Sequence, residues 1–299
     1  MLTFVPTLDC RGRSLALDRT RICGILNITP DSFSDGGAFS DTSSAIAHGL
    51  ALVEQGADLL DIGGESTRPG AVAISADEEI ARVVPVIEAL AAQTQVPISI
   101  DTSKPEVMRA AVVAGAGLIN DVYALRRPGA LDAAAELGAA VCLMHMQGEP
   151  QTMQESPQYD DVVGEVHRFL AERLFACQLA GIDKKKLLVD VGFGFGKTLE
   201  HNLTLLRQLE KFKTLYVPLL VGLSRKSMIA SLTGRSSAER VFGSVAAALI
   251  AAQRGAAIVR VHDVAATRDA LAIWQAVDSG AAAAVKSKPA ATSRLWDDD

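Results

Sequence analysis

Eight short aliphatic runs, each followed by a loop and an amphipathic segment, are the feature that most restricts how this 299-residue chain can fold. Strands that alternate with helices in this way form βαβ units and a parallel sheet. Eight such units in one chain favour a closed barrel over an open sheet. We therefore predict an α/β fold, a single (β/α)8 TIM barrel, with strands at 22–27, 58–63, 97–101, 117–121, 140–145, 186–190, 218–222 and 256–261.

The barrel is predicted to occupy residues 1–279. The remaining segment, 280–299, has low complexity and predicts a disordered tail. Within the barrel, Ser75 with Glu78 and Ser103 with Glu106 each match a capping box, in which the serine accepts a backbone N–H that the start of a helix leaves unpaired. We expect a helix to begin after each of these serines.

Charge and cysteine content narrow the function classes. The formal net charge is −6 and both signs are spread through the chain, so no nucleic-acid or membrane surface is indicated. The cysteines Cys10, Cys23, Cys142 and Cys177 are widely spaced and form no CxxC pair, which argues against structural zinc and a disulfide framework. No apolar run reaches transmembrane length. We expect a soluble, cytoplasmic protein with reduced thiols.

The carboxyl ends of all the predicted strands carry a polar residue or a glycine. In barrel enzymes this rim holds the active site, whereas the barrel interior is filled by aliphatic side chains. One or two polar strand ends would be ordinary turn chemistry, because Asp and Asn often begin turns. Here every run shares the feature, so we place the candidate site at Asn27, Gly63, Asp101, Asn120 with Asp121, His145, Asp190, Gly222 with Ser224, and Arg260 with His262.

Asp101, Asn120 and Asp190 supply hydrogen-bond acceptors that suit a flat ligand rich in N–H donors. Each carboxylate can accept a bidentate pair from an aminopyrimidine edge, and the amide of Asn120 both donates and accepts. The alternative for either aspartate alone is an N-cap or a partner of a buried lysine.

Arg68, Lys226, Arg260 and His262 form a second group, which is cationic or rich in donors. Many barrels bind phosphate after strands seven and eight, and the motifs SRKS and RVH, which contain the last three of these residues, follow those strands. Arginine offers a planar fork to phosphate oxygens, and lysine a mobile point charge. Solvated surface charge, the commonest fate of Lys and Arg, is the alternative.

The glycine-rich segment at 192–198, GFGFGKT, resembles a nucleotide loop only superficially. A P-loop needs a glycine at the position of Val191, and the dinucleotide fingerprint needs its third glycine where Lys197 stands. The loops at 34–37 and 63–70 are able to close over a ligand, although plain turns are the alternative. His145 could act as a base or be a hydrogen-bonded core histidine.

Eight motifs, in order along the chain, resemble the dihydropteroate synthase family. They are GILNITPDSFSDGG (24–37), DIGGESTRPG (61–70), IDTSKPEV (100–107), IND (119–121), CLMHMQG (142–148), GFGFGK (192–197), LVGLSRKS (220–227) and RVHDV (260–264). The matches span essentially the whole barrel. The resemblance implies an enzyme of folate synthesis that joins a pterin diphosphate to p-aminobenzoate, with small molecules as its partners and Mg²⁺ as its cofactor. It also implies a homodimer, formed through helices of the late half of the barrel.

By this resemblance, catalytic roles fall to Asp101, Lys226 and Arg68. In the family's dissociative mechanism, Asp101 would stabilise the developing pterin cation, and the cations would stabilise the leaving diphosphate. Asn27 would contact Mg²⁺, since an amide oxygen suits a hard cation. The implied substrate-binding residues are Phe33, Thr67, Arg68, Pro69, Asp101, Asn120, Asp190, Lys226, Arg260 and His262.

Phe33 and Pro69 resemble the walls of the family's p-aminobenzoate pocket, and Thr67 and Arg68 lie on the loop that closes over bound diphosphate. Sulfonamides mimic p-aminobenzoate. Because both wall positions carry the family's ordinary residues, we expect a sulfonamide-sensitive enzyme.

Three rival interpretations stay open. A pterin-binding methyltransferase barrel would share the acidic pocket but needs no diphosphate site. An aldolase-like barrel would use Lys226 as a Schiff base, which requires a desolvated amine, whereas Lys226 follows Arg225 in a predicted loop. A non-catalytic pterin- or folate-binding relative would keep the pocket without turnover.

Overall fold

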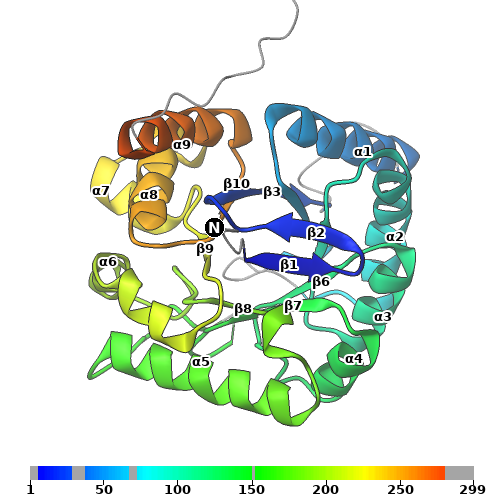
Figure 1. The fold of residues 1–299 in the computed structure, drawn as a ribbon, viewed down its shortest axis with the longest axis horizontal. Helices are drawn as coiled ribbons and strands as arrows, with labels where there is room; N and C mark the ends of the chain where they lie inside the picture. The colour runs from blue at the N-terminus through cyan, green and yellow to red at the C-terminus, as the bar shows by residue number, and fades with distance from the viewer. Residues whose placement is uncertain (1–5, 29–37, 67–72, 150–151, 280–299) are drawn as a thin grey trace, which may run out of the picture.

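The computed structural model describes residues 6–28, 38–66, 73–149 and 152–279, except for the side chains of 38–41. Eight parallel strands form one sheet in the order β8-β7-β6-β5-β4-β3-β10-β9. An isolated parallel bridge between Val189 in β8 and Leu219, the residue before β9, closes this sheet into a ring. Helices surround the ring (Figure 1), and the predicted (β/α)8 barrel is confirmed.

The barrel strands each overlap one predicted run: β3 (Arg21–Asn27), β4 (Leu59–Gly63), β5 (Ile98–Asp101), β6 (Leu118–Asp121), β7 (Ala140–Met144), β8 (Leu187–Asp190), β9 (Leu220–Gly222) and β10 (Ile258–Val261). The α-helices are α1 (Ala38–Gln55), α2 (Ala76–Gln93), α3 (Pro105–Ala114), α4 (Ala130–Leu137), α5 (Val162–Leu179), α6 (Leu199–Arg207), α7 (Ser227–Thr233), α8 (Val241–Gln253) and α9 (Val264–Ser279). Short 3-10 helices lie at Lys184–Lys186, Leu209–Leu215 and Ser237–Glu239.

An antiparallel hairpin, β1 (Thr7–Cys10) and β2 (Arg13–Ala16), precedes the barrel and was not among the predicted strands. Its side chains Leu8, Cys10 and Leu15 pack against residues that face the barrel interior near the strand starts. The hairpin lies across this opening of the ring (Figure 1). It therefore closes the end of the barrel opposite the candidate site.

The barrel interior has an apolar floor and a polar layer above it. Successive side chains of a strand point to opposite faces, so interior positions are two residues apart. The floor contains a buried aliphatic residue from each of four alternate strands: Leu59, Leu118, Leu188 and Ile258. Two residues later the same strands, β4, β6, β8 and β10, carry Asp61, Asn120, Asp190 and Arg260. Side chains from alternate strands fill one layer of such a barrel, so these four polar groups are expected at one level.

The two predicted helix caps have opposite outcomes. Ser75 caps α2 by accepting the backbone N–H of Glu78 at 3.1 Å, which confirms that helix start. The prediction for Ser103 is wrong, because Lys104 occupies the N-cap position of α3 and makes no side-chain cap. The hydroxyl of Ser103 instead donates to the buried carboxylate of Asp121, since a charged acceptor makes the stronger hydrogen bond.

The predicted tail at 280–299 lies outside the described residues, and its disorder stays a prediction. The four cysteines are buried and free. Burial raises the pKa of Cys10 to about 12 and that of Cys177 to about 11, which keeps both as thiols. Within the described part of the chain, we find no helix with the length and apolarity needed to cross a membrane.

Candidate active site

The polar layer joins side chains from strands that are far apart in the sequence. The amide of Asn120 donates to Oδ2 of Asp61 at 3.1 Å, and Nε of Arg260 donates to the same oxygen at 2.5 Å. Nη2 of Arg260 also donates to Oδ2 of Asp101, at the end of β5, at 2.8 Å. Arg260 therefore bridges two carboxylates.

The charges of this cluster depend on one another. Burial opposes the charged form of Arg260, but Asp61 and Asp101 outweigh that effect and raise the pKa of the guanidinium. Burial raises the pKa of Asp101, and Arg260 opposes this rise. Oδ1 of Asp61 is buried and has no hydrogen-bond partner among the described residues. An unsatisfied acceptor in an otherwise paired cluster is suited to a ligand that brings N–H donors.

These contacts change the predicted division into acceptors and cations. The sequence placed Arg260 with the anion-binding group, yet the structure pairs it with Asp61 and Asp101. The alternative in which Asp101 pairs with a buried lysine is wrong, because its basic partner is an arginine.

Lys226, the residue before α7, is held by the loop that follows β8. Its amine donates to the carbonyl of Phe193 and lies 4.6 Å from the centroid of the Phe195 ring. Asp190, which ends β8, is 5% exposed and accepts the N–H of Gly192 at 2.8 Å. Burial lowers the pKa of Lys226 to about 8, and the charge of Asp190 opposes this shift. The amine is therefore cationic at neutral pH but less strongly so than an ordinary lysine.

The amine of Lys226 is desolvated, contrary to the expectation from its place in a loop. Lys226 stands in the loop after β9, as predicted, but the loop that follows β8 packs against its amine and desolvates it. Its burial therefore does not exclude an aldolase-like barrel.

The loops after β9 and β10 are tied together. Oγ of Ser224 lies 2.9 Å from Nδ1 of His262 and accepts the backbone N–H of His262 at 3.2 Å. Next to it, Arg225 donates to both carboxylate oxygens of Asp263, at 3.1 and 2.6 Å. These contacts hold His262 against Ser224, two residues before Lys226. The two loops therefore lie together, which is the grouping expected of a phosphate site.

Asn27 ends β3 beside the polar layer. Its side-chain oxygen and the Cβ of Asp101 each lie 3.6 Å from the position that a Cβ on Gly63 would occupy. The donor suits Mg²⁺, which binds oxygen ligands, usually takes only one or two of them from the protein, and shares substrate phosphates. Asn27 therefore fits the expected metal contact.

Phe33, Thr67, Arg68 and Pro69 lie outside the described residues, so their roles stay predictions. The sequence reasoning missed Asp61, which is 1% exposed at the centre of the cluster. The available signal was a carboxylate inside the aliphatic run 58–63, because a charge is tolerated at a buried strand position only with partners.

His145 is a core histidine rather than a base at the rim. Its Nδ1 lies 2.9 Å from Nζ of Lys197, and its ring meets that of Phe169 edge-on with centroids 4.9 Å apart. Burial, followed by the charge of Lys197, lowers the pKa of His145 to about 2. The imidazole is therefore neutral, and the hydrogen-bonded alternative is confirmed.

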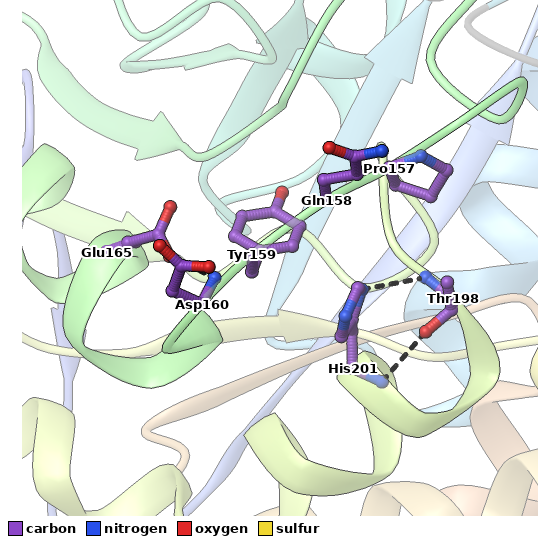
Figure 2. Close-up of a pocket in the computed structure, with 7 residues that line it drawn as sticks. All are labelled: Pro157, Gln158, Tyr159, Asp160, Glu165, Thr198 and His201. Carbon is purple, nitrogen blue, oxygen red and sulfur yellow. Dashed lines mark hydrogen bonds between the residues drawn. The ribbon is translucent and has the colours of Figure 1, made fainter.

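A cavity of about 620 Å³ opens between the loop before α5 and the start of α6 (Figure 2). Its lining consists of Pro157, Gln158, Tyr159, Asp160, Glu165, Thr198 and His201. Thr198 and His201 cap each other's backbone N–H groups there, each at 3.2 Å. None of the rim residues described above lines this cavity, so it is separate from the cluster around Arg260.

Comparison with known proteins places the chain among pterin-binding enzymes. The family described as "Pterin binding enzyme" matches residues 23–262. A dihydropteroate synthase of Escherichia coli (strain K12) is 54% identical over 269 residues, which cover 90% of this chain and 95% of that protein.

Solved structures show the same similarity. The dihydropteroate synthase of Xanthomonas albilineans with 4-aminobenzoic acid has a TM-score of 0.88 and 63% identity, covering 92% of this chain and 99% of that one. The Yersinia pestis dihydropteroate synthase with a sulfonamide drug complex has a TM-score of 0.88 and 52% identity, covering 91% and 99%. The similarity therefore extends over the whole barrel.

Proposed function

The chain belongs to the dihydropteroate synthase family, which condenses 6-hydroxymethyl-7,8-dihydropterin diphosphate with p-aminobenzoate, and we propose how its rim residues divide that reaction. The observation that carries the proposal is the polar layer, in which Arg260 bridges Asp61 and Asp101 next to Asn120. Acceptors for a donor-rich heterocycle and cations for an anion meet there. A methyltransferase or aldolase barrel would not account for 54% identity to a dihydropteroate synthase over 90% of the chain.

The pterin binds to Asp101, Asn120 and Asp190. The carboxylate of Asp190 is aimed into the barrel and can accept a pair of N–H groups from the aminopyrimidine edge. Asn120 is held by Asp61, so the orientation of its amide is fixed before the ligand arrives. Preorganisation of this kind lowers the cost of binding.

The diphosphate binds near Lys226, Arg260, His262 and Arg68. In the reaction the C–O bond to the diphosphate breaks, and its electron pair leaves with the diphosphate. The amine of p-aminobenzoate then forms the C–N bond at the pterin methylene and loses a proton. Lys226 stabilises the charge on the leaving group, and Asp101 the positive charge that develops on the pterin, because fixed charges act strongly in a desolvated site.

Asn27 would hold the metal at this site. When bound there, Mg²⁺ supplies neutralisation of charge on the diphosphate oxygens. Two observations support Mg²⁺ as the cofactor: Asn27 offers an amide oxygen, and this oxygen lies beside Asp101.

Turnover of the two substrates with Mg²⁺ tests the function. Diphosphate release and dihydropteroate formation are followed together, and we expect equal amounts of both. The rate should disappear with EDTA and in Asp101→Asn and Lys226→Ala, and return on addition of Mg²⁺ to the EDTA-treated enzyme. Binding of pterin diphosphate without turnover would indicate a non-catalytic relative, and no binding would contradict the assignment.

The rate is expected to fall as pH rises through about 8. The charged amine of Lys226 is present below its pKa of about 8 and is lost above it; Asp190, Arg260 and Asp101 are the charged groups that act on it. The profile of kcat/KM for pterin diphosphate between pH 6.5 and 10.0 should therefore have an alkaline limb near 8. Lys226→Arg keeps its charge over this range, and persistence of the same limb in this variant would assign it to another group.

We expect inhibition by sulfonamides in competition with p-aminobenzoate. The support is the identity of Phe33 and Pro69 and the similarity to the Yersinia pestis enzyme with its sulfonamide drug complex. Turnover should fall with excess sulfamethoxazole at low p-aminobenzoate and recover as p-aminobenzoate is raised. Unchanged turnover would contradict the expectation.

A homodimer is proposed through α7, α8 and α9, which adjoin one another around the ring (Figure 1). These helices expose the apolar residues Leu232, Phe242, Ile250, Ile273 and Val277. Exposed apolar side chains gathered on neighbouring helices are typical of an interface. We expect a particle of about twice the 31.5 kDa chain mass, converted to monomer by Phe242→Asp. Phe175, on α5, is also an exposed phenylalanine, so Phe175→Asp is the matched control and should stay dimeric.

A cytoplasmic location is also proposed. Its support is the set of four free, buried thiols, which need no oxidising compartment. Secretion of the native protein by its host would contradict this location.

A further inference from the structure

Lys197 ends the glycine-rich segment GFGFGK, to which the proposed reaction assigns no part. We propose that Lys197 is a positioning residue for Lys226, acting by fixing the shape of the loop at 191–198. This inference rests on the proposed function, because its effect is on the diphosphate-binding amine.

The amine of Lys197 is buried against four acceptors. Nζ lies 2.9 Å from the carbonyl oxygens of Gly192 and Phe195, 2.9 Å from Nδ1 of His145 and 3.5 Å from the carbonyl oxygen of His145. The side chain is 3% exposed. These acceptors take up the N–H donors of the amine, and the neutral imidazole of His145 is able to accept one of them. Lys197 therefore joins both ends of its own loop to the end of β7.

The same loop is packed against β7 so tightly that two of its residues must be glycine. Gly192 and Gly196 have φ of +69° and +59°, in the left-handed region. A Cβ on either would collide with a backbone carbonyl, of His145 and Gln147 respectively. The buried side chain of Asn202 also holds the loop, because its Oδ1 accepts the N–H of Gly194 at 2.8 Å.

Lys226 rests on the loop that these contacts shape. Its amine donates to the carbonyl of Phe193 and lies over the ring of Phe195, and its Cδ lies 3.2 Å from where a Cβ on Gly194 would stand. The carbonyl of Phe195 is itself bound by Lys197. One residue therefore connects Lys197 to the ring beneath Lys226.

Burial of the Lys197 amine is unfavourable in itself, so its hydrogen bonds to the loop must offset that cost. Burial lowers the pKa of Lys197, and Asp190 opposes the shift. Without Lys197, the carbonyl of Phe195 would lose its donor, which is unfavourable in a turn packed against the core. The carbonyl of Gly192 would keep only the backbone N–H of Phe195, at 3.2 Å. Lys197 donates to both carbonyls at once, which a shorter or apolar side chain does not.

The test compares two pairs of full-length variants. Lys197→Met keeps the length of the side chain and removes its donors. Its control is Lys186→Met, because Lys186 also donates to a backbone carbonyl, that of Gly138, at 2.6 Å, but outside the site. His145→Asn keeps an acceptor near the position of Nδ1, whereas His145→Leu removes it. Melting temperature, kcat and KM for each substrate, and the alkaline limb near pH 8 are measured for all four.

We expect Lys197→Met to lower kcat by about 100-fold, the effect of a misplaced catalytic group. KM for p-aminobenzoate should change little. Its alkaline limb should move upward as the Lys226 amine becomes better hydrated. Lys186→Met should lose stability but keep kcat within about twofold. His145→Asn should retain more turnover than His145→Leu.

Wild-type turnover is measured first, and its failure would count against the proposed function alone. With an active wild-type enzyme, a folded Lys197→Met variant with normal kcat and an unmoved limb overturns the positioning role. If Lys197→Met does not fold, the His145 variants decide. A higher kcat in His145→Asn than in His145→Leu supports the positioning role, and equal kcat values overturn it.

Discussion

Replacing Arg260 with methionine is expected to lower the free energy of unfolding at pH 7 by about 3–5 kcal/mol, the cost of leaving buried charges without their partner. Arg260 pairs with both Asp61 and Asp101, and Asp61 is almost fully buried. The variant should also lose about 10³-fold in kcat, because the anion loses a cation and Asp101 loses its position. Urea unfolding and steady-state kinetics measure the two effects.

A double variant separates charge from packing. Arg260→Met leaves two carboxylates without a basic partner, and adding Asp61→Asn removes one of them. Part of the lost stability should therefore return, without recovery of turnover. Arg225→Met is the control for breaking a two-contact ion pair, here with Asp263. Arg225 is about one-third exposed, so its loss should destabilise the protein less. Equal destabilisation by Arg260→Met and Arg225→Met would contradict the role of the buried layer.

Asp190→Asn is expected to weaken binding of the pterin by at least roughly 100-fold, because charge-assisted hydrogen bonds contribute about 1.5–3 kcal/mol each. The amide keeps the shape of the side chain but can accept only one of a pair of N–H groups. It also removes the carboxylate that favours the charged form of Lys226. Calorimetric titration with a pterin measures the change directly.

Asp121→Asn is the matched control for this substitution. Asp121 is also a buried aspartate at a strand end, but its oxygens accept the N–H groups of Tyr123 and Leu125 at 2.8 Å each, as well as the hydroxyl of Ser103. It should lower stability and leave pterin affinity nearly unchanged. Loss of affinity in both variants would show that the rim as a whole, rather than Asp190, determines binding.

Local pattern was sufficient for the strands and for most of the rim. The position of a strand end follows from where an aliphatic run stops, so Asp101, Asn120 and Asp190 could be named from the sequence. The cap at Ser75 is equally local and was predictable. Ser103 was not, because a nearby buried carboxylate competes for its hydroxyl, and that carboxylate reaches it only in the folded barrel.

The resemblance to the dihydropteroate synthases likewise came from contiguous motifs, and the comparisons confirm it. Motifs record which residues a site keeps, but they do not record how those residues pair. The sequence therefore assigned Arg260 to the anion, whereas the structure gives it two carboxylate partners.

The sequence by itself determined the (β/α)8 barrel, the rim and the family, because strand period, strand ends and motifs are properties of neighbouring residues. Tertiary structure alone decided that Asp61 belongs to the site, since it meets Arg260 from a strand almost two hundred residues away. It also decided that Lys226 is desolvated against the loop at 191–198 and that Lys197, within that loop, is buried. Desolvation and charge pairing depend on what surrounds an atom in space, and those surroundings are formed only when the ring closes.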